Sequence, residues 1–319
     1  MRRRRSPQAT RQQHSVFYPT DYAGGGPPFP VALQEMYTQM FIDDLARGLL
    51  PYRAQSRNAD FRIGIEPTDR AREEMIAAAL TRGERQGLAS SLREFLRLLT
   101  SELFYTPRAI YEIALTNDPG ANPQNGVDLV FIDERQVKED AGGIYQIVPP
   151  EIAAARKVAE RIPLPRESLI IFTLPPPMGR LISDVKATLS ILSDQRFFEM
   201  ALNAQKTGLP YNFTEHQRSM NLALAEVGKT IGWTARGTFN RATLSFHWIQ
   251  MQLRFERFKL RLREALLGQL NTGLRRIEGP LGFSPEIKIF GLPTEADIDK
   301  ASEQLSAGQS PFTEVMKPF

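Results

Sequence analysis

The sequence predicts an α+β protein with a helix-rich body and a small antiparallel sheet. In several long segments apolar residues recur every three or four positions, which is the period of a helix with one buried face. Between residues 108 and 173 the apolar residues instead form short runs bounded by glycine and proline, as in strands. The chain has 319 residues, of which 42% are hydrophobic and 24% charged, so it can bury one or two cores.

The amino-terminal segment is basic, whereas the rest of the chain is nearly neutral. The net charge is +4, and residues 1–12 contain no acid and five arginines, namely Arg2, Arg3, Arg4, Arg5 and Arg11. The remainder holds 35 basic and 36 acidic residues. With the glycines and prolines at 24–28, residues 1–30 are predicted to be a disordered arm. The arm either contacts nucleic acid or an acidic partner, or is a solvated tail without a specific role.

Two helical regions follow the arm. The segment 31–50 has one broad apolar face, and Pro51 ends it. The region 70–104 is also helical and is expected to break or bend near Gly83 and Gly87, because glycine is unfavourable inside a helix.

Strand-like segments come next. Three strands are expected at 108–116, 127–133 and 144–148, arranged as an antiparallel meander. A fourth, buried strand lies within 165–173 and has prolines on both sides. The run of prolines and glycine at 175–179 is expected to exclude helix and to turn the chain.

The second half of the chain is predicted to be mainly helical. Helices are expected at 181–204, 215–231 and 245–270, with loops at 205–214 and 232–243. The last of these helices should be about 40 Å long. Its apolar stripe consists of Trp248, Met251, Phe255, Phe258, Leu262 and Leu266.

A strand and a short helix are expected near the carboxyl end. Residues 286–290 alternate like a strand, and Thr294 followed by Asp297 forms a capping pattern for a helix that ends near Leu305.

Signs of enzyme chemistry are weak. Residues 228–230 read Gly-Lys-Thr, but the glycine that a phosphate-binding loop needs earlier is replaced by Ala223, and the segment lies in a predicted helix. There is no cysteine, and His14, His216 and His247 are far apart in the sequence. We therefore expect no catalytic activity, no metal and no cofactor. No apolar stretch approaches the ~20 residues of a membrane span, so a cytoplasmic protein is expected.

Several segments, taken in order, resemble the portal proteins of tailed bacteriophages. The motifs that carry this resemblance are YEIAL at 111–115, DERQV at 133–137, IYQI at 144–147 and LIIF at 169–172. Their order along the chain matters more than any single motif. The resemblance implies a wing at 31–180, a stem helix at 181–204, a small clip at 205–214, a second stem helix at 215–231, a tunnel loop at 232–243, and a long wing-crossing helix with the last wing segment at 244–319. Long crown helices are expected to be absent.

The resemblance also implies a function. Portal proteins form a ring of twelve copies at one capsid vertex, which is the channel for packaging and ejection of double-stranded DNA. The expected partners are the terminase large subunit, the head–tail adaptor and the major capsid protein, with no membrane partner. The protein would reside in the virion, and in the host cytoplasm during assembly. The alternative is a small nucleic-acid-binding protein that uses the arginine arm, and a hydrolase with an unrecognised site ranks third.

Within the expected tunnel loop, the candidate DNA-channel residues are Trp233, Arg236, Phe239, Asn240 and Arg241. The arginines could touch phosphates, a contact that needs only flexible cations and no base readout. The aromatic side chains could instead anchor the loop to the next subunit.

A basic stripe on the long helix is a second candidate surface. Arg254, Arg257 and Arg261 lie roughly opposite the apolar stripe. They either contact an anion or form a solvated face that pairs with Glu256, Glu264 or a neighbouring subunit.

Overall fold

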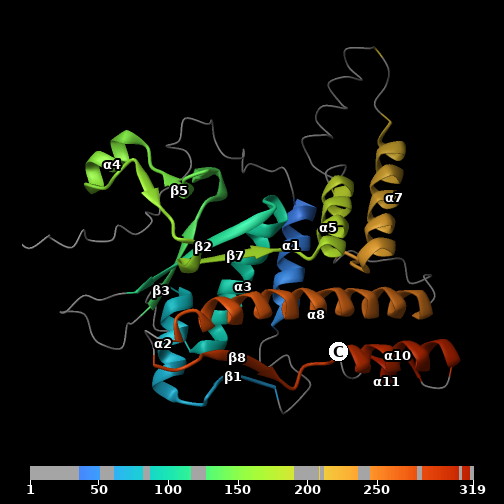
Figure 1. Ribbon diagram of the computed structural model, residues 1–319. Coiled ribbons are helices and arrows are strands. Elements are labelled where there is room, and N and C mark those ends of the chain that lie inside the picture. The colour runs from blue at the N-terminus through green and yellow to red at the C-terminus, as the bar shows by residue number, and fades with distance from the viewer. Residues whose placement is uncertain are drawn as a thin grey trace, which may run out of the picture.

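In the part of the chain that the computed structural model describes, helices surround two three-stranded sheets and one two-stranded ribbon (Figure 1). The described residues are 36–50, 61–81, 87–115, 127–189, 208, 212–235, 245–278, 282–308 and 311–316. The helices are α1 (Met36–Leu49), α2 (Arg70–Thr81), α3 (Leu88–Tyr105), α4 (Pro150–Arg156), α5 (Pro176–Leu189), α7 (Phe213–Ile231), α8 (Ser245–Arg275), α10 (Glu295–Ala307) and α11 (Phe312–Val315). The strands are β1 (Arg62–Glu66), β2 (Arg108–Leu115), β3 (Val127–Ile132), β4 (Val137–Asp140), β5 (Gly143–Ile147), β6 (Arg161–Pro163), β7 (Leu169–Thr173) and β8 (Glu286–Phe290).

Strand β2 is the centre of the main sheet, which has the antiparallel order β3-β2-β7. Tyr111 of β2 lies opposite Phe131 and Ile170 in this register. Its ring packs against Phe95 of α3 and Phe172 of β7, with centroid distances of 5.0 and 5.7 Å. Burial raises the pKa of the Tyr111 hydroxyl well above its ordinary value, so this ring is a neutral part of the core.

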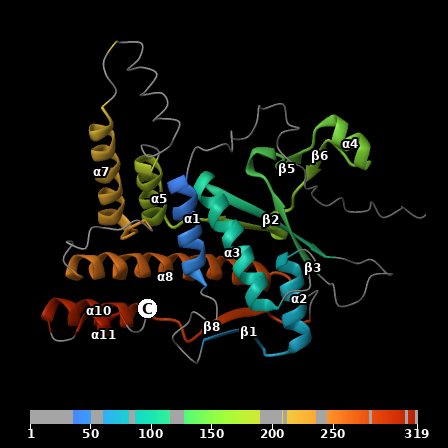
Figure 2. The ribbon, with the colours of Figure 1, turned by 180° about the vertical axis from the view of Figure 1, so that it is seen from behind.

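A second antiparallel sheet, β4-β5-β6, carries α4 and lies at the end of the molecule away from α7 (Figures 1 and 2). Its own small core contains Val148, Ala153 and Ile162. The buried side-chain amide of Gln146 donates to the Gln136 oxygen at 3.1 Å, so these two buried polar groups satisfy each other.

Helix α8 is buried on two sides. At ~1.5 Å per residue its 31 residues span about 46 Å, which is enough to cross the whole body. Its first face enters the main core with Phe255, Phe258, Leu262, Leu266, Leu270 and Leu274. Its second face, which includes Ile249, Leu253 and Leu260, packs against Ile298 of α10 and Val315 of α11. Figures 1 and 2 both show α8 running between the sheet-bearing body and α10.

Two amide side chains join α8 to strand edges. The Gln269 amide donates to the Thr173 carbonyl at 2.9 Å, and the Thr173 N–H donates to the Gln269 oxygen at 2.8 Å. The buried Asn271 amide donates to the Ile287 carbonyl of β8 at 3.0 Å, and the Ile287 N–H donates to the Asn271 oxygen at 2.9 Å. Side-chain amides therefore occupy backbone groups at the free edges of β7 and β8, where another strand could otherwise pair.

Most of the expected elements are present. The break in the region 70–104 is confirmed, because α2 ends at Thr81 and α3 begins at Leu88. The capping pattern is also confirmed: the hydroxyl of Thr294 accepts from the Asp297 N–H, and the Asp297 carboxylate accepts from the Thr294 N–H. Parts of the expected arm, stem helix, clip and tunnel loop (residues 1–30, 190–204, 205–207, 209–211 and 236–243) lie outside the described residues.

Two expectations about the fold are wrong. The three strands do not form one meander, because β5 pairs with β4 and β6, while β3 pairs with β2, whose other neighbour is β7. The prolines do not exclude helix either: α5 begins at Pro176 and includes Pro177. The first N–H groups of a helix have no intrahelical acceptor, so prolines fit in its first turn.

Replacing Phe258 with alanine should lower the free energy of unfolding by ~3–5 kcal/mol, because the ring is 6% exposed and its loss leaves a cavity. Trp248 is the matched control. It is 41% exposed, so Trp248→Ala should cost roughly 1 kcal/mol or less. Denaturant unfolding followed by circular dichroism measures both, and equal losses would contradict the assigned faces of α8.

Glu102 should make stability depend on pH. Burial, and then the negative charge of Asp133, raises the pKa of the Glu102 carboxyl, although a hydrogen bond from Thr106 opposes this. Between the unfolded and folded pKa the folded state holds more protons, so the free energy of unfolding falls as pH rises through that window. Glu102→Gln keeps an acceptor for Thr106 and should raise the melting temperature at neutral pH, with little effect at pH values below the ordinary pKa of 4.5.

The control for this pH effect is Glu94→Gln. A hydrogen bond from Arg97 lowers the pKa of Glu94, so that substitution should lower the melting temperature slightly at neutral pH. A Glu102→Gln variant that melts below the parent at neutral pH would refute the assignment.

Candidate nucleic-acid interface

The sharp corner after α7 fixes where the expected tunnel loop leaves the body. Gly232 caps α7 with φ 84°, in the left-handed region, and its N–H donates to the Gly228 carbonyl at 2.9 Å. A Cβ at this position would lie 2.0 Å from the Met251 carbonyl oxygen and 2.7 Å from the Phe255 nitrogen. Only glycine therefore allows α7 to end this close to α8.

Trp233, the next residue, is anchored inside the body. Its side chain is 2% exposed, and its ring meets Phe41 of α1 edge-on with centroids 5.3 Å apart. Its indole N–H donates to the Asp44 carboxylate at 3.1 Å. The expectation that Trp233 lines a DNA channel is therefore wrong, because its only polar atom is used inside the chain.

The remaining loop candidates lie outside the described residues. These are Arg236, Phe239, Asn240 and Arg241, and the arm arginines Arg2, Arg3, Arg4, Arg5 and Arg11 lie outside them as well. The two ends of the loop are nevertheless defined. Ala235, with φ 46° and 6% exposure, is the last described residue on the amino-terminal side, and α8 begins at Ser245 on the other side.

The basic stripe of α8 is largely engaged within the chain. Arg257 pairs with Asp299, and Arg261 donates through Nε to Glu295 at 3.1 Å. Both acids belong to α10, so the expected partners Glu256 and Glu264 are not the ones that these arginines use. Arg254 is exposed and donates to the backbone carbonyl of Lys229, at the end of α7. The stripe thus holds α10 and the α7 corner against α8, and only part of its charge faces outward.

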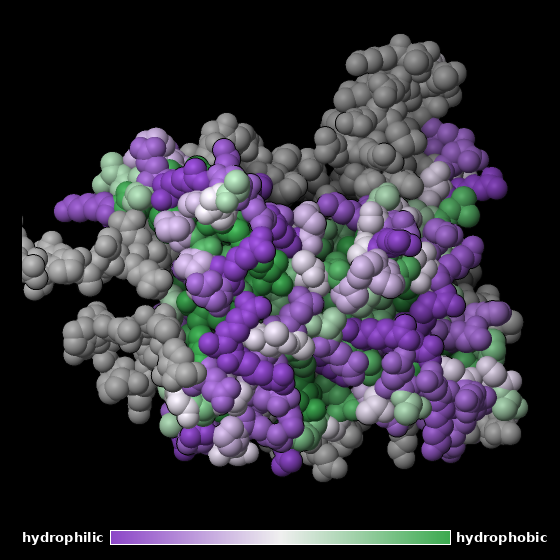
Figure 3. Space-filling view, in the orientation of Figure 1, coloured by the Kyte–Doolittle hydropathy of each residue, from purple (hydrophilic) through white to green (hydrophobic). Residues whose placement is uncertain are grey.

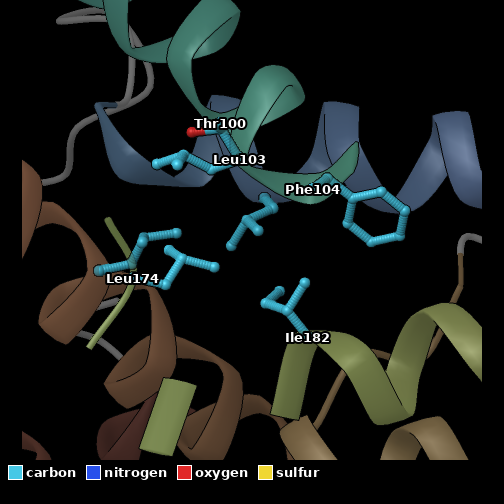
Figure 4. Close-up of a pocket in the computed structure, with 7 residues that line it drawn as sticks. Thr100, Leu103, Phe104, Leu174 and Ile182 are labelled. Atoms are coloured by element: carbon cyan, nitrogen blue, oxygen red, sulfur yellow. The ribbon is translucent and has the colours of Figure 1, made fainter. Parts of the chain in front are cut away.

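Hydrophilic side chains cover most of the face seen in Figure 3, and the hydrophobic atoms that reach the surface there lie in narrow strips between them. The gap at the junction of α1, α3, α5 and α8 is small and apolar (Figure 4). Its volume is about 10 Å³, and the one polar side chain in its lining, Thr100, donates to the Leu96 carbonyl at 2.7 Å. Because a water molecule needs ~10–15 Å³, this gap is a packing defect and not a ligand site.

No group of three or more His, Asp or Glu side chains is placed to hold a metal ion in the described ranges. No helix among the described residues is long and apolar enough to cross a membrane. The Gly-Lys-Thr segment at 228–230 lies in α7, as expected from the sequence.

Two residues at this corner, Phe41 and Asp44, were given no functional role from the sequence. In the sequence they belong to an ordinary amphipathic helix, and Asp44 stands next to Asp43 without any pattern that marks it. Only the contacts with Trp233, which is 189 positions from Asp44, reveal their role.

No protein-family model matches the chain, and no curated protein sequence matches it. Solved structures that align with most of the chain come from gene transfer agent particles. A chain from the neck of an empty particle, computed with C6 symmetry, is 12% identical, with a TM-score of 0.48, over 93% of this chain and 92% of the other. A chain from the neck of a native particle, computed with C12 symmetry, is 11% identical, with a TM-score of 0.47, over 86% of each chain. A virion chain of the native particle is 12% identical, with a TM-score of 0.43, over 88% of each.

Gly232→Ala should lower the free energy of unfolding by ~1–3 kcal/mol or more, because a Cβ would clash with α8 and the left-handed φ would be strained. Gly268→Ala is the matched control. Position 268 lies inside α8 with no atom within 4 Å of an added Cβ, so that change should raise stability by ~0.5–1 kcal/mol. Calorimetry measures the stability of both variants. A Gly232→Ala variant as stable as the parent would contradict the close approach of α7 to α8.

Proposed function

We propose that this protein is the subunit of a phage-type portal ring, the channel through which double-stranded DNA enters and leaves a capsid at one vertex. In this role the protein performs no covalent chemistry and needs no metal or cofactor. The terminase large subunit docks on the ring during filling, the head–tail adaptor binds it later, and the major capsid protein surrounds it.

The order and placement of the helices carry the proposal. Helices α5 and α7 pack side by side and project from one end of the body, across the direction of α8 (Figures 1 and 2). The chain then turns at Gly232 and returns through α8, which crosses the body to the ribbon of β1 and β8. The sequence resemblance assigns stem, second stem, tunnel loop and wing-crossing helix in this same order.

The corner supports a tunnel loop within the expected segment 232–243, starting after the buried residues Trp233 and Ala235. Trp233 fixes the chain to α1, and Arg254 fixes the end of α7 to α8, so the loop starts from a rigid base. The loop contains Arg236 and Arg241, whose charges suit weak, exchangeable contacts with phosphates. Such contacts resist the passage of DNA little, because they do not depend on its sequence.

Helix α7 has surface suited to a ring. Phe213 is 58% exposed and Leu222 is 63% exposed, and nine residues place them about 180° apart on the helix. In a closed ring each subunit uses two different patches, one toward each neighbour. Large apolar side chains on opposite sides of a projecting helix fit that geometry better than a twofold dimer, which uses one patch twice.

Native mass separates this proposal from the alternative. Twelve copies of the 36.0 kDa chain make a ring of about 430 kDa, whereas a small nucleic-acid-binding protein that relies on the arginine arm would remain a monomer or dimer. Light scattering after size-exclusion chromatography makes the distinction, and a purely monomeric protein at all concentrations would refute the portal proposal.

Replacing Arg236 and Arg241 together with alanine should leave the mass of the ring unchanged and lower DNA packaging or retention, with little dependence on DNA sequence. The control removes the same charge elsewhere: Lys138→Ala with Arg156→Ala, both exposed and both at the far end of the body. Packaging into empty capsids measures both. If the loop variant packages and retains DNA like the parent, or the control loses as much, residues 236–243 are not the tunnel loop.

A further inference from the structure

A groove between α8 and α10 carries chemistry that the portal proposal does not use. Its volume is about 210 Å³, smaller than a pocket for a drug-sized ligand and suited to one or two side chains. Leu253 and Leu305 form its apolar part. Its polar lining consists of Gln250, Arg254, Arg257, Ser302 and Ser306.

The charged side chains that line the groove are both arginines. No acid lines it, although Asp299 outside the lining pairs with Arg257. The Nε of Arg257 is buried and has no hydrogen-bond partner within the described part of the chain. The hydroxyls of Ser302 and Ser306 donate to backbone carbonyls of α10, so the free donors of the groove come mainly from the arginines.

We propose that this groove binds a carboxylate side chain on a segment of a partner protein. The two guanidinium groups would bind the carboxylate, a charge-assisted contact that is stronger than a neutral hydrogen bond.

A DNA phosphate fits the groove less well. The same helix α10 carries Glu295, Asp297, Asp299 and Glu303, whose charges would repel a polyanion more than a single carboxylate. The inference does not depend on the portal proposal, because the groove lies within one subunit.

The test uses the full chain and two probes, the peptides acetyl-Leu-Glu-Leu-amide and acetyl-Leu-Gln-Leu-amide. Saturation-transfer NMR should show binding of the glutamate peptide, and roughly tenfold weaker binding of the glutamine peptide, as expected for the loss of a charge-assisted contact. Arg254→Gln should lower the affinity for the glutamate peptide by a similar factor, and Arg254→Lys should retain part of that affinity. Because Arg254 also donates to the Lys229 carbonyl, the melting temperature of each Arg254 variant is measured first, and only variants that melt like the parent are compared.

Arg261→Gln is the matched control, because Arg261 belongs to the same stripe but lies outside the groove. It should leave peptide affinity unchanged. Equal affinity for the two peptides, or an equal loss with Arg261→Gln, would overturn the proposal. If Arg254→Gln weakens binding of a short DNA duplex and the peptides do not discriminate, the groove is a phosphate site and the proposal is wrong.

Discussion

The rest of the structure depends on the burial of α8 on two faces at once. One face completes the main core and the other binds α10 and α11, so the helix connects two separate apolar clusters. Two of its arginines, Arg257 and Arg261, pair with acids of α10 along the border between the two helices. The polar residues Gln269 and Asn271 reach the free edges of β7 and β8 because the helix passes directly beside them. The helix thus sets the positions of the sheet, the ribbon and the carboxyl-terminal helices together.

Helix α1 is also held in place, by arginine side chains that bind its carboxyl end. Two carbonyls at its carboxyl end accept hydrogen bonds from arginines. Arg93 donates to the Leu50 carbonyl at 3.1 Å, and Arg263 donates to the Leu49 carbonyl at 3.4 Å. The negative end of a helix dipole favours such cations. Burial lowers the pKa of Arg263, but guanidinium groups begin from so high a value that the charge remains. Together with the Asp44–Trp233 contact, these bonds connect α1 to α3, to α8 and to the α7 corner, so the candidate loop begins from a well-supported base.

The elements whose signals are local could be predicted from the sequence. The period of α8, the capping box at Thr294 and Asp297, and the interruption between α2 and α3 are each written within a few neighbouring residues. The strand partners could not be predicted, because β1 pairs with β8 across more than two hundred residues and no local pattern selects that partner. The role of Trp233 was misjudged for the same reason. In the sequence it stands among glycines and arginines, like a loop residue, whereas a carboxylate from α1 and a ring from the core bury it.

By itself the sequence determined the long helices and the strands β2, β3, β5, β7 and β8, but not β1, β4, β6 or α4. It also determined that the positive charge is concentrated in the arm, and the order of segments that resembles a portal protein. Backbone propensity and hydrophobic period fix such features over short distances. The tertiary structure alone decided which charges remain available. Arg257 and Arg261 look alike in the sequence, yet packing against α10 places one in a groove and the other outside it, and gives each its own acid. Whether a side chain is a binding group or a structural one depends on the neighbours that folding brings to it, and those neighbours come from distant parts of the chain.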